Sequence, residues 1–256
     1  MNATIATQAP SATLPRDERF FLIMAIVMAA VTAAGFSVNV ALGRSSFAAP
    51  LLLHVHALVF FGWVALYLAQ TFLAARGSLA LHRRLGWLSL VWMPAMVVIA
   101  LLVVRDSVQS RGGPPFFALN EFLIGNTLAL LCFAGLVAAG VVNRRRTAWH
   151  RRLMFCSMAM LTGPGWGRLL PTPLFIPWSW WVVGFAAPAI FPLIGIVADR
   201  RRGRRVHPAW WWGLGAMVAT HVVAQVIAFS PLGLAITHWV VDGTPGGARD
   251  FAPHFP

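Results

Sequence analysis

The sequence predicts an all-α integral membrane protein, a bundle of seven transmembrane helices. Of its 256 residues, 59% are hydrophobic and 11% are charged, whereas a soluble domain carries roughly a quarter charged residues. The mean hydropathy is +0.73, and a single core of this size cannot hide that much apolar surface from water. The composition therefore excludes a soluble globular protein, and it also excludes a disordered chain.

Seven segments are long and apolar enough to cross a bilayer, whose hydrocarbon core of about 30 Å requires roughly 20 residues of helix. These segments lack the alternation with period two that is typical of transmembrane barrels. No stretch between them is long enough for a soluble domain. The expected spans are 20–43, 51–75, 82–104, 119–142, 150–170, 178–199 and 208–233.

The ends of the chain are expected to lie outside this bundle. Residues 1–17 are predicted to be a disordered tail that stays on the chain, because they lack the apolar region and cleavage site of a signal peptide. Residues 18–240 form the transmembrane domain, and residues 241–256 form a short outer tail. Cys132 and Cys156 fall inside apolar segments, and their spacing matches no metal or redox motif.

The positions of the arginines predict how the chain is oriented in the membrane. All 20 basic residues are arginine, and the net charge is +13. Fifteen of them lie in the N-terminal tail or in the loops after the second, fourth and sixth spans, and cytoplasmic loops carry such an excess. We therefore expect a cytoplasmic N-terminus, an outer C-terminus, a bacterial inner membrane as location, and no nucleic-acid partner. Because the sequence has no lysine, a Schiff base to retinal is excluded.

Three cytoplasmic loops end on a histidine at the start of the returning helix. The blocks are LHRRLGW, WHRRLMF and RRVHPAW, with His82, His150 and His207. They suggest one leading helix followed by three hairpin units. The histidines have three interpretations: interfacial residues without a further role, part of an anion or lipid-headgroup site at helix N-termini, or ligands of a metal or haem iron. The anion site would comprise His207, Arg83, Arg84, Arg151 and Arg152.

Polar residues inside the spans are costly and point to function. His56, Trp63 and Gln70 recur every seven residues and share a stripe that should face the bundle. His221 and Gln225 share one face of the last span. The alternative is that these histidines bond to a neighbouring helix for structural reasons.

The fifth span is predicted to break near Gly163, because Pro164 follows it within a glycine-rich segment. Irregular backbone at this depth lines a protein interior or a cavity, and broken helices mark binding sites in transporters. We expect Arg168 to pair with Glu121, either beside an outward-facing cavity or as a structural pair. A substrate site here would use Arg168, Glu121, Asn120, Asn126 and Gln70.

Motifs of established chemistry do not occur in the sequence. It contains no Gly-rich phosphate loop, no His-Glu-x-x-His and no arguable Ser-His-Asp set. Catalytic residues and a metal site made of protein ligands alone therefore stay unassigned.

Several blocks together carry a resemblance. LHVHALVFFGWVALYLAQ (53–70), LHRRLGW, WHRRLMF, LTGPGWGRLLP (161–171) and RVHPAWWWG (205–213) resemble a group of proteobacterial multi-pass inner-membrane proteins, over residues 18–235. That resemblance implies a fold and a location but no activity.

More loosely, the chain is similar to transmembrane di-haem cytochromes of the b type, which place histidine pairs on neighbouring helices. This likeness implies His82 and His150 as axial ligands of an inner haem. His56 and His221 are weaker candidates for an outer one, because the fourth span contains no histidine.

Three functional hypotheses follow. The leading one is a membrane redox protein with b-type haem or a quinone. The second is a transporter or binding protein for a small molecule or a lipid, which uses the broken fifth helix. The third is an accessory subunit of a larger membrane complex. The expected partners are the bilayer, anionic lipid headgroups, a quinone or small molecule, and a membrane protein.

Overall fold

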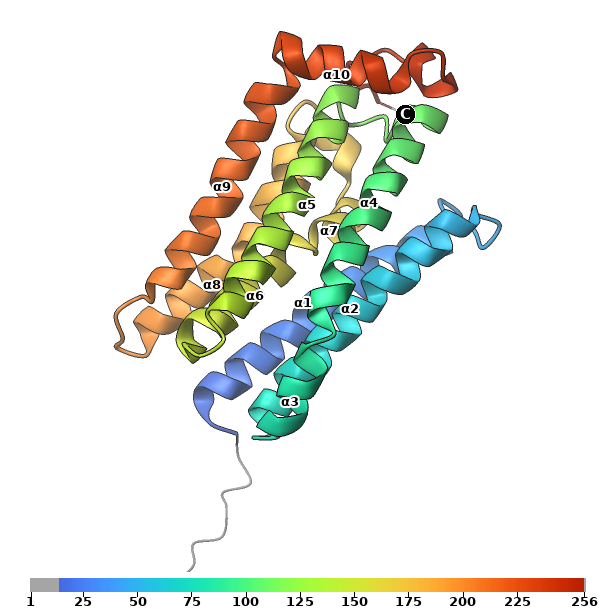
Figure 1. The fold of residues 1–256 in the computed structure, drawn as a ribbon. Helices are drawn as coiled ribbons and strands as arrows, with labels where there is room; N and C mark the ends of the chain where they lie inside the picture. Colours follow the sequence, from blue (N-terminus) through green and yellow to red (C-terminus); the bar gives the residue numbers. More distant parts are fainter. Residues whose placement is uncertain (1–13, 256) are drawn as a thin grey trace, which may run out of the picture.

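The computed structural model describes residues 14–255, which form an all-α bundle without a strand (Figure 1). The helices of this range are α1 (Arg16–Ala41), α2 (Leu51–Ala75), α3 (Leu79–Gly86), α4 (Ser89–Arg111), α5 (Leu119–Val142), α6 (Thr147–Met160), α7 (Gly163–Leu169), α8 (Ala187–Arg201), α9 (Pro208–Ala228) and α10 (Pro231–Val241). A π-helical turn, η2 (Trp181–Ala186), runs into α8, and η1 (Thr172–Phe175) and η3 (Pro245–Ala248) are short 3₁₀ turns.

Six of the described helices are long and apolar enough to cross a membrane. They are α1, α2, α4, α5, the continuous segment Trp181–Arg201, and α9. Large hydrophobic side chains such as Leu58, Val91 and Val226 stay exposed on their outer faces, as expected where lipid rather than water surrounds a helix. The predictions of an all-α fold and of a membrane protein are therefore confirmed.

The core lies between the helices and is filled mainly by aromatic and methionine side chains. Helix α5 is central, since it packs against α4, α6 and α9. Helix α1 packs against α2 and α7, and α2 also packs against α4. Large side chains of the main buried cluster include Met28, Trp63, Met96, Phe133, Phe155, Met158, Trp210 and Met217. This packing places the two ends of the bundle in different surroundings.

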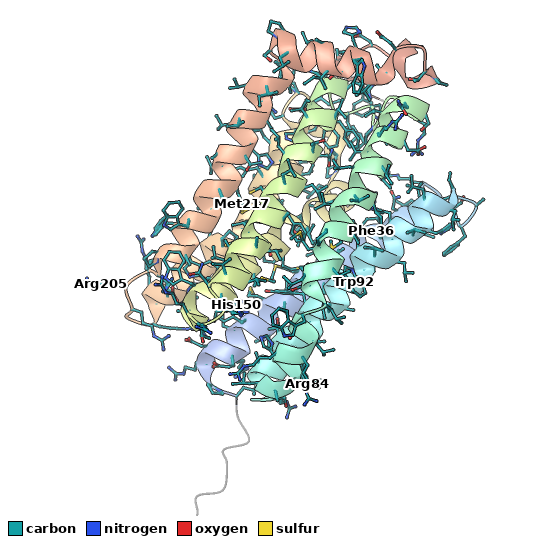
Figure 2. All side chains as sticks on the ribbon, viewed as in Figure 1. Phe36, Arg84, Trp92, His150, Arg205 and Met217 are labelled. Carbon is teal, nitrogen blue, oxygen red and sulfur yellow. The ribbon has the colours of Figure 1, made fainter. Side chains whose placement is uncertain are left out.

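One end of the bundle, at the bottom of Figure 1, holds the start of α1, the short helix α3, and the α5–α6 and α8–α9 connections. Arg84, His150 and Arg205 lie toward this end (Figure 2). We call it the arginine-rich end. The opposite end holds α10 and the segment that follows it.

The third expected span begins too early. The sequence predicted a helix over 82–104, but α3 ends at Gly86 and the long helix α4 starts at Ser89. Ser89 donates its hydroxyl to the Gly86 carbonyl at 2.6 Å and thereby closes the turn between the two helices. His82 therefore lies in a short helix before the spanning one.

The break predicted in the fifth span is confirmed. Helix α6 ends at Met160 after 14 residues, and α7 begins at Gly163. Pro164 lacks a backbone N–H and thereby favours a helix start. Helix α7 then packs tightly on α1, because a Cβ at Gly35 would overlap the backbone of Gly165.

The last expected span, 208–233, is shorter than predicted. Helix α9 ends at Ala228, and Pro231 starts α10, which lies across the end of the bundle (Figure 1). The Ser230 hydroxyl accepts the N–H of Gly233 and caps α10, as serine before proline favours a new helix start.

The expected tails differ as well. Of the tail predicted over 1–17, residues 1–13 lie outside the described residues, and the chain is helical from Arg16. The segment after α10 folds back over the α4–α5 connection. Its Arg249 donates to the carbonyl groups of Gly112, Pro114, Pro115 and Phe117.

Candidate functional site

Two of the predicted ligand residues, His82 and His150, meet at the arginine-rich end. His82 comes from α3, and His150 comes from the first turns of α6. Their ring centres are 6.1 Å apart, and the ring planes are nearly perpendicular at 88°. Both side chains are half-buried. The two histidines of the shared His-Arg-Arg-Leu block are therefore neighbours in space.

Each of these rings is fixed by a backbone carbonyl. His82 Nδ1 donates to the Gln70 carbonyl at 3.2 Å, and His150 Nδ1 donates to the Gly140 carbonyl at 2.8 Å. A carbonyl oxygen can only accept, so Nδ1 carries the proton in both rings. In the neutral imidazole the lone pair is then on Nε2, which is the arrangement that histidine metal ligands adopt.

The two hairpins repeat this arrangement. In the first, the accepting carbonyl belongs to α2 near its end, and in the second it belongs to α5 near its end. In each case the histidine follows on the next helix of the chain. The weak sequence repeat thus corresponds to a repeated local geometry around His82 and His150.

His207 does not share this geometry. Its Nδ1 accepts the N–H of Ala209 at 3.1 Å, so it caps the start of α9. Its ring packs against Trp149 with centres 5.3 Å apart. Burial, and then the positive charge of Arg152, hold the pKa of His207 below its ordinary value. The third histidine of the loop pattern is a helix cap.

The spacing of His82 and His150 suits a shared metal. An imidazole bound through Nε2 has its ring centre about 3 Å from the metal, since the bond itself is about 2 Å long. Two imidazoles that share one metal can therefore have ring centres up to about 6 Å apart, and the observed distance is 6.1 Å. Within residues 14–255, no group of three or more His, Cys, Asp or Glu side chains could hold a metal. Two imidazoles alone match haem iron, because the porphyrin supplies its remaining ligands.

The predicted outer candidates, His56 and His221, are not brought together. The ring of His56 contacts Phe60, whereas that of His221 contacts aromatic residues of the η2 segment. His221 is 1% exposed, and its Nδ1 donates to the Met217 carbonyl at 3.0 Å. These positions give no second histidine pair within the described residues.

The stripe on α2 faces the bundle, as the sequence predicted. Trp63, at its centre, is 2% exposed. Each of its three residues carries a buried polar atom without a partner in the structure: His56 Nδ1, Trp63 Nε1 and Gln70 Oε1. Such atoms are rare in folded proteins and call for a ligand, a water molecule or another explanation.

The proposed pair between Arg168 and Glu121 is wrong. Glu121 accepts a hydrogen bond from the side chain of Gln225 instead. Arg168 donates to the Pro164 carbonyl at 2.7 Å, and its guanidinium lies 4.0 Å from the centre of the Phe36 ring. The break after α6 leads Arg168 toward α1 rather than toward the start of α5.

The two asparagines of the expected substrate site have backbone partners. Asn120 donates to the Ala228 carbonyl at 2.8 Å, and Asn126 donates to the Phe122 carbonyl at 2.7 Å. Asn120 thereby joins α5 to the end of α9. The bond of Asn126 lies within α5, so neither asparagine side-chain amide is left free for a substrate by these contacts.

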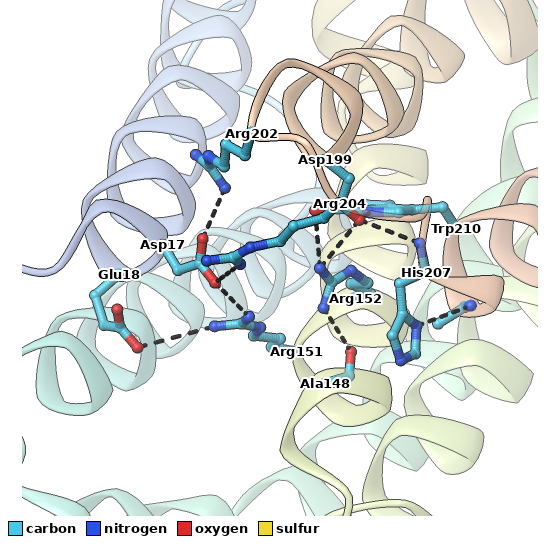
Figure 3. A network of polar contacts seen from close by, with 11 residues as sticks. Asp17, Glu18, Ala148, Arg151, Arg152, Asp199, Arg202, Arg204, His207 and Trp210 are labelled. Carbon is cyan, nitrogen blue, oxygen red and sulfur yellow. Dashed lines mark hydrogen bonds and ion pairs between the residues drawn. The ribbon is translucent and has the colours of Figure 1, made fainter.

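Arg152, one residue of the expected anion site, belongs instead to a buried ion pair with Asp199 (Figure 3). Arg152 is 4% exposed, and its guanidinium bonds to both carboxylate oxygens of Asp199 at 3.0 and 3.1 Å. Trp210 Nε1 and the His207 N–H also donate to Asp199. Arg152 is therefore part of the interior and not of an exposed anion surface, which is a correction of the expectation.

Asp17 organises a second group of arginines beside this pair (Figure 3). It accepts from Arg151 at 2.9 Å, from Arg202 at 2.8 Å and from Arg204 at 2.7 Å. Arg151 therefore has an internal acid partner, whereas Arg83 and Arg84 stay exposed. The start of α1 is tied in this way to α6 and to the end of α8.

Sequence reasoning missed Asp17 and Asp199 as organising residues. A usable signal was present, because the chain has only seven acidic residues and these two lie on the arginine-rich side. An acid among many arginines is expected to be paired.

An apolar groove of about 590 Å³ runs along α5, α6 and α9. Asn143 and Trp149 line one part of it, and Leu128 and Val223 lie further along it. The groove can take up an apolar molecule, and its lining includes neither His82 nor His150.

No family model, no curated protein and no solved structure matches this chain. The case for function therefore depends on the geometry of its own residues.

Proposed function

We propose that the chain is a seven-span protein of the bacterial inner membrane with its N-terminus in the cytoplasm. Helices α6 and α7 together would provide the crossing that neither is long enough to make alone. The start of α1, the α5–α6 connection and the α8–α9 connection lie at one end of the bundle. The arginines of these segments support placing that end in the cytoplasm.

We propose further that the protein binds one b-type haem through His82 and His150 and takes part in membrane electron transfer. The observation that carries this proposal is the paired geometry: two imidazoles 6.1 Å apart, each with Nδ1 bonded to a backbone carbonyl. This leaves both Nε2 atoms free as ligands. Bound haem would supply one-electron chemistry, with a potential that its axial ligands and surroundings adjust.

The chain's own residues would orient these ligands. The Gln70 and Gly140 carbonyls fix the tautomer and the rotation of each ring, as partners of ligating histidines do elsewhere. Arg144, whose guanidinium lies 6.0 Å from the Trp87 ring, helps to hold the two hairpins together. The apolar groove along α5, α6 and α9 would admit an apolar electron carrier, and we propose a quinone in that role.

The test is a reduced-minus-oxidised absorption spectrum of protein purified from haem-replete cells. We expect a b-type spectrum for the wild type and its loss in His82→Ala and in His150→Ala. His238→Ala is the matched control, because His238 is exposed on α10 at the other end. A wild type without a haem spectrum, or variants that keep it unchanged, would exclude the proposal.

A further inference from the structure

Arg168 is a cation without an anion. All seven acidic residues of the chain lie within the described range, and none of them forms an ion pair with Arg168. Its guanidinium faces the Phe36 ring and a carbonyl oxygen. A charge kept at membrane depth without a partner is costly and is retained where it has a function.

The edge of the guanidinium that best binds an oxyanion is free. Nη1 is taken by the Pro164 carbonyl, but Nε is buried without a partner, and Nη2 makes no hydrogen bond to the described residues. The Nε–Nη2 edge presents two parallel N–H groups, which match two oxygens of a phosphate or carboxylate. The side chain is half-buried, so the Nη2 end can be reached from outside.

His56 adds a second unpartnered group. The Phe36 ring that Arg168 faces packs against Phe61 of α2 with ring centres 5.3 Å apart, five residues along that helix from His56. His56 Nδ1 is buried without a hydrogen-bond partner. Two polar groups from α2 and α7 thus lack what one bound oxyanion would provide. Glu121, which would repel an anion, is turned toward Gln225.

The position favours phosphate among the oxyanions. Phe36 precedes the end of α1 by five residues, and His56 follows the start of α2 by five. At 1.5 Å per residue this is about 8 Å inside the helix ends. Helices of 25 residues extend beyond a hydrocarbon core of about 30 Å, so the site lies near the boundary where lipid headgroups begin.

We propose that Arg168 and His56 bind a phosphate group, supplied either by a phospholipid headgroup or by free phosphate. The site is separate from His82 and His150, so either proposal can fail without the other. Phosphate oxygens would accept from the Nε–Nη2 edge of Arg168 and from the ring of His56.

The experiment uses the full chain, purified in detergent and stripped of lipid. Its thermal unfolding midpoint, followed by tryptophan fluorescence, is measured against increasing inorganic phosphate at constant ionic strength. A second series uses soluble dihexanoyl phosphatidylglycerol. The variants are Arg168→Gln, His56→Gln and the control Arg105→Gln, because Arg105 is exposed on α4 near the same end and has no ion-pair partner.

We expect a rising midpoint in at least one series for the wild type and for Arg105→Gln. A response to inorganic phosphate identifies the free ion, and a response to the lipid alone identifies the headgroup. Arg168→Gln should weaken the apparent affinity by roughly ten- to a hundredfold. Without ligand its midpoint should equal or exceed that of the wild type, because an unpaired charge has been removed.

His56→Gln keeps the proposal testable if Arg168→Gln does not fold, and it should weaken binding several-fold. A wild type that responds to neither probe would overturn the proposal. It would also be overturned if folded Arg168→Gln, or His56→Gln in its place, responded as the wild type does.

Discussion

At the scale of single residues, the tautomer distinguishes the two candidate ligands from the third histidine of the loop pattern, His207. His82 and His150 donate Nδ1–H to carbonyls, whereas His207 accepts a backbone N–H at the same atom. All three look alike in sequence, since each begins a returning helix after arginines. The positions of the three histidines in the sequence therefore make all of them candidate ligands. Only their hydrogen bonds distinguish the candidate ligand pair from the histidine that caps a helix.

Asp199 is the residue whose loss should cost most stability. It accepts from Arg152, Trp210 and the His207 N–H, and it is 2% exposed. Asp199→Asn would leave Arg152 as an uncompensated buried charge, at a cost of about 3–5 kcal/mol in the free energy of unfolding. Urea or thermal unfolding in detergent would measure this cost.

Asp242→Asn serves as the control, because Asp242 is exposed and should change stability by less than about 0.5 kcal/mol. The double variant Arg152→Met, Asp199→Leu should recover much of the loss, since apolar pairs often replace buried ion pairs without penalty. Equal stability of Asp199→Asn and the wild type would contradict the account of this network.

At the scale of elements, the interrupted fifth span shows where sequence reasoning succeeds. Gly163 and Pro164 predicted the break, because the backbone preferences of glycine and proline act on the helix at their own positions. The direction of α7 after the break was not predictable, since it depends on the close approach of Gly165 to Gly35 on α1. For that reason, the expected ion pair between Arg168 and Glu121 does not form.

Gly35→Ala should disturb the packing of α7 on α1. The added methyl group would overlap the Gly165 backbone, and such overpacking costs about 1–3 kcal/mol. Gly135→Ala is the matched change, because Gly135 lies in α5 with open space around it and should gain up to about 1 kcal/mol from helix propensity. If both variants shifted the unfolding midpoint alike, the close contact between α1 and α7 would be refuted.

The Arg249 side chain makes most of the hydrogen bonds that hold the segment after α10, beside two backbone bonds that involve Phe251 and His254. Arg249 donates to four carbonyl groups of the α4–α5 connection. Arg249→Ala should therefore release residues 245–255. Hydrogen exchange would detect this as faster exchange of the His254 amide, which donates to the Pro115 carbonyl, and of the Leu119 amide, which donates to the Phe251 carbonyl. Arg111→Ala, at an exposed arginine of α4, should leave their protection unchanged; unchanged protection in Arg249→Ala as well would show that the tail is held by other contacts.

At the scale of the whole molecule, the amino-acid composition predicted an integral membrane protein. The positions of the arginines predicted which loops lie on the same side of the membrane. The all-α membrane architecture and five of the long helices followed directly from apolar length and loop charge. The ends of the third and seventh spans did not, because Trp87 and Phe229 are apolar and mask the turns in a hydropathy profile. The placement of α10 across the bundle depends on Ser230 and Pro231 rather than on hydrophobicity.

The proposed topology makes its own prediction. Single cysteines placed at Ser78, beside α3, and at Ser46, in the α1–α2 loop, should be labelled from opposite sides of an intact inner membrane vesicle. Cys132 and Cys156 lie in helices, half-buried and buried, and the unmodified chain gives the background. Labelling of both new positions from the same side would contradict the seven-span arrangement.

The central claim is that His82 and His150, which belong to two different hairpins, together bind one haem. The amount of haem per chain tests this claim most directly. Haem extracted from purified wild-type protein should amount to about one per chain, because the described residues bring together one histidine pair with its Nε2 atoms free. His82→Ala and His150→Ala should each reduce it to a trace, while His56→Ala and His221→Ala keep it. Absence of haem from the wild type, or its full retention in either His82→Ala or His150→Ala, would contradict the account.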